Sequence, residues 1–177
     1  MEQKENQFRQ LIERYAADVL WLVERLIPQR EDAEDVAQDV FVAVYENLER
    51  FDETKASFRT WLMRIAYYTA IKRLRDKGKV SFVEMEEEPL DVVAEDVTDE
   101  LLSEAPPNRK TLLEQAVRLL SEADQLLLML YYYHDKSVRE IAYITGHKES
   151  YLHSRFQWLR KKLCTIIIKL EKDGKKH

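Results

Sequence analysis

The chain of 177 residues contains only three glycines, four prolines and one cysteine. So few glycines exclude a glycine-rich phosphate loop, and the scarcity of both turn residues favours a mostly helical chain. The single cysteine, Cys164, excludes an internal disulfide and is typical of a reducing compartment. The longest apolar run, LLLMLYYY at 126–133, is far shorter than the ~20 residues that span a membrane. The polar start MEQKENQFRQ also lacks the apolar segment of a signal peptide, so we expect a cytoplasmic protein without membrane insertion.

The sequence also lacks the patterns of an enzyme. Its four histidines, at 134, 147, 153 and 177, show no metal-ligand spacing with Cys164. Its carboxylates lie in surface-type runs rather than as isolated acids in apolar surroundings. We therefore expect no catalytic residue, no metal site and no cofactor.

Charge is distributed unevenly along the chain, although the net charge is only −5. Residues 1–75 hold 12 basic and 14 acidic side chains, residues 76–108 hold 2 and 11, and residues 109–177 hold 14 and 8. An acidic chain would ordinarily be a poor candidate for a nucleic-acid binder. The basic C-terminal segment nevertheless favours nucleic-acid binding in that part of the chain.

Hydrophobic spacing predicts an all-α fold of two small helical domains. In the first domain, 1–77, we expect helices over 7–27, about 32–48 and about 57–77, with Ser57 as N-cap of the third. The segment 78–108 is acidic, aperiodic and closed by two prolines, which is typical of a flexible linker. Helical patterning returns in the second domain, 109–177.

The second domain carries the pattern of a helix-turn-helix. Ser137 with Glu140 three residues later predicts a capping box at the start of a short helix. Gly146 then provides the left-handed conformation that a tight inter-helix turn requires. The helix that follows has an apolar core stripe of Leu152, Phe156, Leu159 and Leu163.

The face of this helix opposite the core stripe carries side chains suited to base edges in a major groove. They are Ser150, His153, Ser154, Gln157, Trp158 and Lys161. Arg155, Arg160 and Lys162 lie on the flanks, within reach of phosphates. The alternative is a solvated basic face on a structural helix.

The stretch WLMRIAYYTAIKRLRDK at 61–77 combines aromatic and basic side chains on one side of a predicted helix. Opposite its core stripe lie Trp61, Arg64, Tyr68, Lys72 and Arg75. Aromatic side chains stack on unpaired bases while cations follow the backbone, so this row suits a melted DNA strand. The alternative is that Trp61 and Tyr68 pack against another helix.

The segment EDAEDVAQDVFVAVYENL predicts a helix whose outer face is acidic. Its polar residues include Asp32, Asp35, Gln38 and Asp39. Such a face serves as a docking surface for a basic protein partner. The alternative is a solvated face whose first-turn acids suit the helix dipole.

Three segments in this order resemble the bacterial extracytoplasmic-function (ECF) RNA polymerase sigma factors. They are DAEDVAQDVFVAVYENLERFD, SFRTWLMRIAYYTAIKRLRDK and SVREIAYITGHKESYLHSRFQWLRKKL. The resemblance extends from about residue 8 to residue 170. The spacings F-x-x-WL-x-x-IA and S-x-x-EIA-x-x-x-G make it specific. Tyr67 and Tyr68 stand where the family often has a small or basic residue and then Asn, so no particular −10 sequence is implied.

The resemblance implies a role for each segment. The helix predicted over about 32–48 would bind the clamp coiled coil of the largest RNA polymerase subunit. Its polymerase-binding residues would be Asp32, Asp35, Gln38, Asp39 and Phe41. The loop at 51–58 and the row from Trp61 to Arg75 would recognise and open the −10 element, with a base flipped into a pocket. The helix-turn-helix would read the −35 element of promoter DNA, with His153, Ser154, Gln157 and Trp158 at base-reading positions. An anti-sigma factor is the usual inhibitor in this family and is a further candidate partner.

Two alternatives of other classes stay open. An ordinary helix-turn-helix regulator would bind duplex DNA but neither polymerase nor a melted strand, which leaves the acidic helix and the aromatic-basic row unexplained. A helical adaptor that binds only proteins would leave the basic C-terminal segment unexplained.

Overall fold

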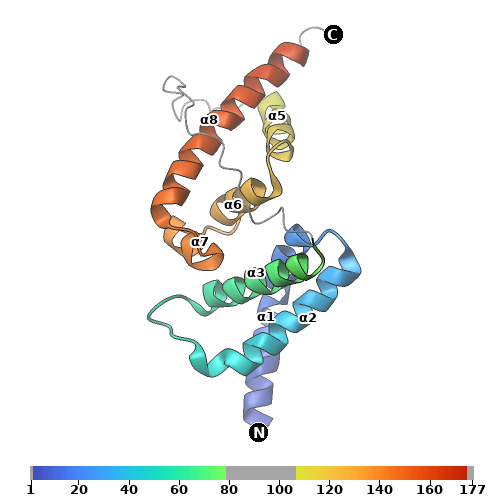
Figure 1. Ribbon diagram of the computed structural model, residues 1–177, viewed down its shortest axis with the longest axis vertical. Helices are drawn as coiled ribbons and strands as arrows, with labels where there is room; N and C mark the ends of the chain where they lie inside the picture. Colours follow the sequence, from blue (N-terminus) through green and yellow to red (C-terminus); the bar gives the residue numbers. More distant parts are fainter. Residues whose placement is uncertain (1, 79–106, 175–177) are drawn as a thin grey trace. The chain divides into compact units, whose positions relative to one another are not determined.

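The computed structural model describes residues 2–78 and 107–174. Every element within these ranges is helical, as Figure 1 shows. Contacts divide the chain into two compact units, residues 1–83 with 136–147 and residues 84–135 with 148–177. The predicted linker at 78–108 lies almost entirely outside the described residues, and the domain boundaries at its ends stay predictions. None of the described helices is long and apolar enough to cross a membrane.

The first unit contains three long helices that pack against one another. These are α1 (Glu2–Leu26), α2 (Arg30–Asn47) and α3 (Phe58–Asp76), with a short 3-10 helix, η1 (Leu48–Arg50), after α2. Each of the three helices buries apolar side chains at helical spacing. The core of these helices includes Val19, Leu22, Val23, Leu26, Val36, Val40, Val44, Leu62, Met63, Ala66, Ala70 and Leu74.

Local signals in the sequence fix the ends of these helices. α1 ends at Leu26, two residues before Pro28, which cannot donate a backbone hydrogen bond. At the start of α3 the Ser57 side chain accepts a hydrogen bond from the Thr60 backbone N–H, so the predicted N-cap is confirmed.

A fourth helix, α7 (Val138–Thr145), belongs to this unit by its contacts and packs against α3. Both hydrogen bonds of the predicted capping box between Ser137 and Glu140 are present. Gly146 follows with a φ of 80°, a left-handed conformation that glycine adopts without steric cost. The predicted order of helix, glycine turn and helix is confirmed, because α8 begins at Glu149.

The second unit contains α5 (Pro107–Arg118), α6 (Glu122–Tyr132) and α8 (Glu149–Gly174). α5 packs against α8, and Ser121 caps α6 by accepting a hydrogen bond from the Asp124 N–H. The predicted core stripe of α8 is buried. The core of this unit comprises Ala116, Leu120, Leu126, Leu127, Leu128, Leu130, Leu152, Phe156, Leu159 and Leu163.

Candidate nucleic-acid interface

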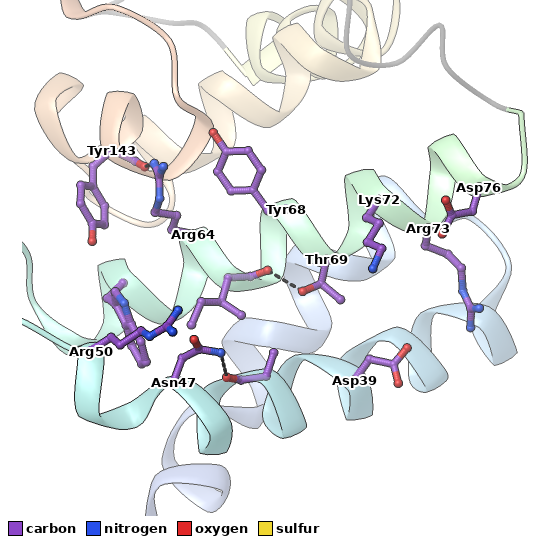
Figure 2. A pocket seen from close by; sticks show the side chains of 13 residues that line it. Asp39, Asn47, Arg50, Arg64, Tyr68, Thr69, Lys72, Arg73, Asp76 and Tyr143 are labelled. Carbon is purple, nitrogen blue, oxygen red and sulfur yellow. Dashed lines mark hydrogen bonds between the residues drawn. The ribbon is translucent and has the colours of Figure 1, made fainter.

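The first unit has a hollow of about 630 Å³ beside α3. α2 and η1 form its other walls, and Tyr143 of α7 lies at one end (Figure 2). α3 contributes a row of side chains to it at three- and four-residue steps, which places them on one face of the helix. Trp61, Arg64, Tyr68 and Lys72, four of the five residues of the predicted aromatic-basic row, line the hollow. Arg75, the fifth, is exposed elsewhere on α3.

Positive charge outweighs negative charge around the hollow. Its cationic side chains are Arg50, Arg64, Lys72 and Arg73, and its carboxylates are Asp39 and Asp76. Among the described residues, the buried Nε of Arg73 has no hydrogen-bond partner. A buried donor left unpaired costs free energy.

Aromatic rings accompany the cations. Tyr68 is 42% exposed, and the Arg64 guanidinium carbon lies 4.8 Å from its ring centroid and 5.0 Å from that of Tyr143. The neighbouring Tyr67 is buried, and burial raises the pKa of its hydroxyl to about 12. Tyr67 is therefore neutral, and the exposed ring of Tyr68 is the one available for stacking on a base.

Trp61 is buried, although the sequence predicted it to be exposed on the outer side of α3. Its side chain is only 9% exposed, and its ring centroid lies 5.3 Å from that of Phe51 and 5.6 Å from that of Phe58. The helical wheel misplaced it because Phe51, from the loop before α3, and Phe58, the first residue of α3, cover this side of the helix. Trp61 forms part of the wall of the hollow and supports the row rather than offering a free stacking surface.

The predicted DNA-reading face of α8 is retained in part. Ser150, His153 and Gln157 are exposed, while Ser154 and Lys161 are half-buried. The Ser154 hydroxyl donates to the backbone carbonyl of Ser150, at 3.2 Å. The exposed members recur at three- and four-residue steps and form one row along the helix.

Arg155 and Trp158 do not lie on this exposed row. Arg155 is 6% exposed, and its Nε and Nη2 donate to the two carboxylate oxygens of Asp124 at 2.8 and 2.7 Å. Trp158 is 4% exposed, with the Arg155 guanidinium carbon 4.1 Å from its ring centroid. Their predicted outer placement is wrong because α8 buries a second side, where the Asp124 carboxylate of α6 is paired.

The predicted polymerase-docking residues lie along α2. Asp35, Gln38 and Asp39 are exposed, whereas Phe41 is half-buried. Asp32 is half-buried and forms an ion pair with the Lys77 ammonium, which ties the start of α2 to the end of α3. Two large apolar side chains stand among the acids of this helix, Val42 at 58% exposure and Tyr45 at 46%.

Sequence reasoning missed several of these residues. Arg50 and Arg73 lie outside the predicted row, and their shared hollow depends on how α2 and η1 meet α3. Tyr143 is distant in sequence and joins through the packing of α7. Val42 was detectable, because the wheel places it between Gln38 and Asp35 on the outer face of α2.

The sequence of this chain is similar to those of RNA polymerase sigma factors. The family model for sigma-70 region 2 matches residues 11–80, which contain α2 and α3. The RNA polymerase sigma factor YlaC of Bacillus subtilis is 30% identical over 92% of this chain and 93% of its own length. The ECF RNA polymerase sigma factor SigW of the same organism is 28% identical over 88% of each chain.

Two solved structures share the fold. CnrH in complex with the cytosolic domain of CnrY covers 93% of this chain and 90% of its own, with a TM-score of 0.57 and 19% identity. The sigma factor RpoE in complex with the anti-sigma factor NepR, from Bartonella quintana, covers 91% and 96%, with a TM-score of 0.56 and 20% identity. The full-length sequence similarity and the region 2 match show that the chain belongs to the ECF RNA polymerase sigma factors, which direct promoter-specific initiation of transcription rather than catalyse a reaction.

Proposed function

We propose that the hollow beside α3 holds DNA of the −10 element in its separated form. The observation that supports this most strongly is the gathering of four cations and an exposed tyrosine at one concave site. Cations alone suit duplex DNA, whereas cations with an aromatic face suit single strands. In this proposal Tyr68 stacks on a base, while Arg50, Lys72 and Arg73 bind the backbone.

The exposed row of α8 reads the −35 element in this proposal. The side chains of Ser150, His153 and Gln157 supply hydrogen-bonding groups for base edges. Lys161 and the exposed Arg160 lie near enough in sequence to contact phosphates on either side. Arg155 and Trp158 contribute by holding α8 against α6, not by contacting DNA.

Core RNA polymerase binds the outer face of α2 in this proposal, through the clamp coiled coil of its largest subunit. Asp35, Gln38, Val42 and Glu46 lie within one stripe of that helix and are all exposed. A stripe that combines carboxylates with exposed apolar groups suits a partner with basic and apolar side chains. Asp39 lies at the edge of this stripe and also lines the hollow.

Three further features complete the proposal. The RpoE structure contains an anti-sigma factor, and we propose a protein of that kind as a regulator of this chain. The chain works in the cytoplasm, where its polymerase and its promoters are found. It supplies binding and positioning, and the polymerase supplies the chemistry.

Open-complex formation with core polymerase tests the role of the hollow. We expect Lys72→Ala and Tyr68→Ala to reduce permanganate reactivity of unpaired thymines about tenfold on a duplex promoter, and less on a pre-melted one. The promoter is one selected by transcription of a genomic library. Arg75→Ala is the matched control, because Arg75 is an exposed cation of α3 outside the hollow. Equal losses on duplex and pre-melted templates would exclude a role in melting.

A further inference from the structure

α7 occupies part of the same face of α3 that lines the hollow. Thr60, Arg64, Tyr68 and Lys72 follow one another at four-residue spacing and form one row on α3. The first three contact α7, and only Lys72 is left without a contact to it in the described hydrogen bonds and ring contacts. α7 therefore competes with any other ligand for most of this row.

The first contact is a buried polar cluster. The Thr60 hydroxyl donates to Oε1 of Glu140 at 2.7 Å, and Nζ of Lys136 donates to Thr60 Oγ1 and Glu140 Oε1 at 2.9 and 3.1 Å. Thr60 is fully buried and Lys136 is 6% exposed. Burial by itself would raise the pKa of Glu140, but hydrogen bonds from Thr60, Ser137 and Lys136 lower it to about 2. The cluster is thus a hydrogen-bonded joint between α3 and α7 in which Glu140 is a carboxylate.

The second contact lies at the C-terminal end of α7. Nη1 of Arg64 donates to the Tyr143 carbonyl oxygen, and the Tyr68 hydroxyl donates to the Thr145 carbonyl oxygen at 3.3 Å. The last carbonyls of a helix lack intrahelical partners and carry its negative dipole end, so a guanidinium and a hydroxyl stabilise them. The groups that α3 offers to a DNA phosphate or base are here used by the backbone of α7.

Gly146 allows this close approach. A Cβ at this position would overlap the hydroxyl of Tyr68. Glycine at this position therefore serves two purposes, since it adopts the left-handed conformation that ends α7 and leaves space for the Tyr68 side chain.

We propose that α7 is a built-in cover for the DNA-binding face of α3, so that Arg64 and Tyr68 bind either α7 or single-stranded DNA. The inference rests on the proposed function of the hollow and concerns its regulation. The free chain holds α7 on α3, and Lys72, Arg73 and Arg50 remain as the accessible cations of the hollow. Single-stranded DNA displaces α7 when it takes over Arg64 and Tyr68.

Two substitutions outside the DNA-binding residues weaken the cover. Tyr143→Ala removes the ring that lies 5.0 Å from the Arg64 guanidinium carbon. Thr60→Val removes the hydroxyl through which α3 bonds to both Lys136 and Glu140, and it retains the Ser57 cap, because the Thr60 backbone N–H donates to the Ser57 hydroxyl oxygen. Tyr133→Ala is the matched control, since Tyr133 is 77% exposed.

Spin labels on the full-length chain measure whether the cover is closed. Labels at Glu46→Cys and Arg139→Cys, in a Cys164→Ala background, report the separation of α2 and α7. We expect one narrow distance distribution for the wild-type background and for Tyr133→Ala, and a broad one extending to longer distances for Tyr143→Ala and Thr60→Val. A broad distribution in the wild-type background would overturn the proposal.

Binding of a fluorescent single-stranded DNA of mixed sequence separates this inference from the proposed function. We expect Tyr143→Ala to lower the Kd about two- to fivefold, the range that loss of a competing cation–π contact allows. Saturating DNA should broaden the wild-type distance distribution. Unchanged affinity in Tyr143→Ala, or a distance that DNA leaves narrow, overturns the cover. Lys72→Ala tests the hollow itself, and undiminished affinity in that variant overturns the proposed function whatever the distances show.

Discussion

Arg155 is a residue of a type that often contacts DNA, but in this fold it forms a buried ion pair. Its Nε and Nη2 donate to Asp124, which is 1% exposed and also accepts a hydrogen bond from the Ser121 hydroxyl at 2.8 Å. A buried ion pair is strongly destabilised when one partner is lost, because the other charge remains buried and unpaired. The pair therefore fixes α8 to the first turn of α6.

Asp124→Asn tests this fixation. The substitution keeps the shape of the side chain and removes the charge opposite Arg155, so we expect a loss of about 3 kcal/mol in the free energy of unfolding. Urea unfolding followed by circular dichroism measures it. Glu122→Gln, an exposed acid in the same turn, is the control and should change stability by less than about 0.5 kcal/mol. Equal stability of the two variants would show that the pair contributes nothing.

Glu140 makes stability dependent on pH. Its pKa falls from an ordinary 4.5 to about 2 because the hydrogen bonds from Thr60, Ser137 and Lys136 outweigh its burial. A lowered pKa in the folded chain means that the ionised group contributes fully above pH 4.5 and that this contribution is lost as the pH falls toward 2. We expect Glu140→Gln to be less stable than wild type at pH 6, with the difference shrinking at pH 3. Thermal unfolding of both proteins at pH 6 and at pH 3 measures this difference in stability. Glu13→Gln, at an exposed acid, is the control. A stability difference between Glu140→Gln and wild type that is the same at both pH values would contradict the prediction.

At the scale of elements, the best predicted features are those with a local cause. Ser57, the Ser137–Glu140 capping box and Gly146 act within a few residues of chain, so their patterns in the sequence sufficed. Trp61 and Arg155 were misplaced because a helical wheel assumes one buried side. α3 and α8 each bury more than one side, and the partners on those sides, Phe51 and Asp124, come from other elements.

Only the part of the site that lies on one helix could be predicted from the sequence. Arg64, Tyr68 and Lys72 share the hollow as their spacing on one helix required. Arg73 and Arg50 join them only because α2, η1 and α3 meet around one space, which no local pattern encodes. The packing of α7 on α3 was likewise beyond prediction, since Thr60 and Glu140 are 80 residues apart.

The outer stripe of α2 gives a prediction at this scale. Asp35→Lys reverses an exposed charge at the centre of the proposed polymerase face and should weaken binding to core polymerase about tenfold, with a stronger effect at low salt. Fluorescence anisotropy of the labelled chain against core polymerase measures the affinity. Glu114→Lys, an exposed reversal on α5, should leave the affinity unchanged. A comparable loss in both variants would mean that net charge, not this stripe, determines binding.

At the scale of the whole molecule, the charge of two local surfaces is opposite in sign to the net charge of the chain. The chain is acidic, with a net charge of −5, yet the hollow of the first unit and the exposed row of α8 are both bordered by cations. If DNA binds as proposed, local charge determines where it binds, and the acidic remainder disfavours non-specific binding elsewhere on the surface. The hollow and the α8 row belong to different compact units, so the two proposed DNA sites are separate surfaces of one chain.

Separate sites give a prediction for the whole molecule. Lys72→Ala removes a cation from the hollow, and Gln157→Ala removes a group from the proposed base-reading row of α8, so the two substitutions should act at different steps of initiation. Because free energies from distant, independent sites add, the double variant should lose open-complex formation by the product of the two single losses, within about twofold. Rates for the wild type, both single variants and the double variant, measured on one promoter with core polymerase, form the required cycle. A double variant no worse than Lys72→Ala alone would mean that −35 reading has no effect on opening, and a loss far above the product would show that the two units act as one site.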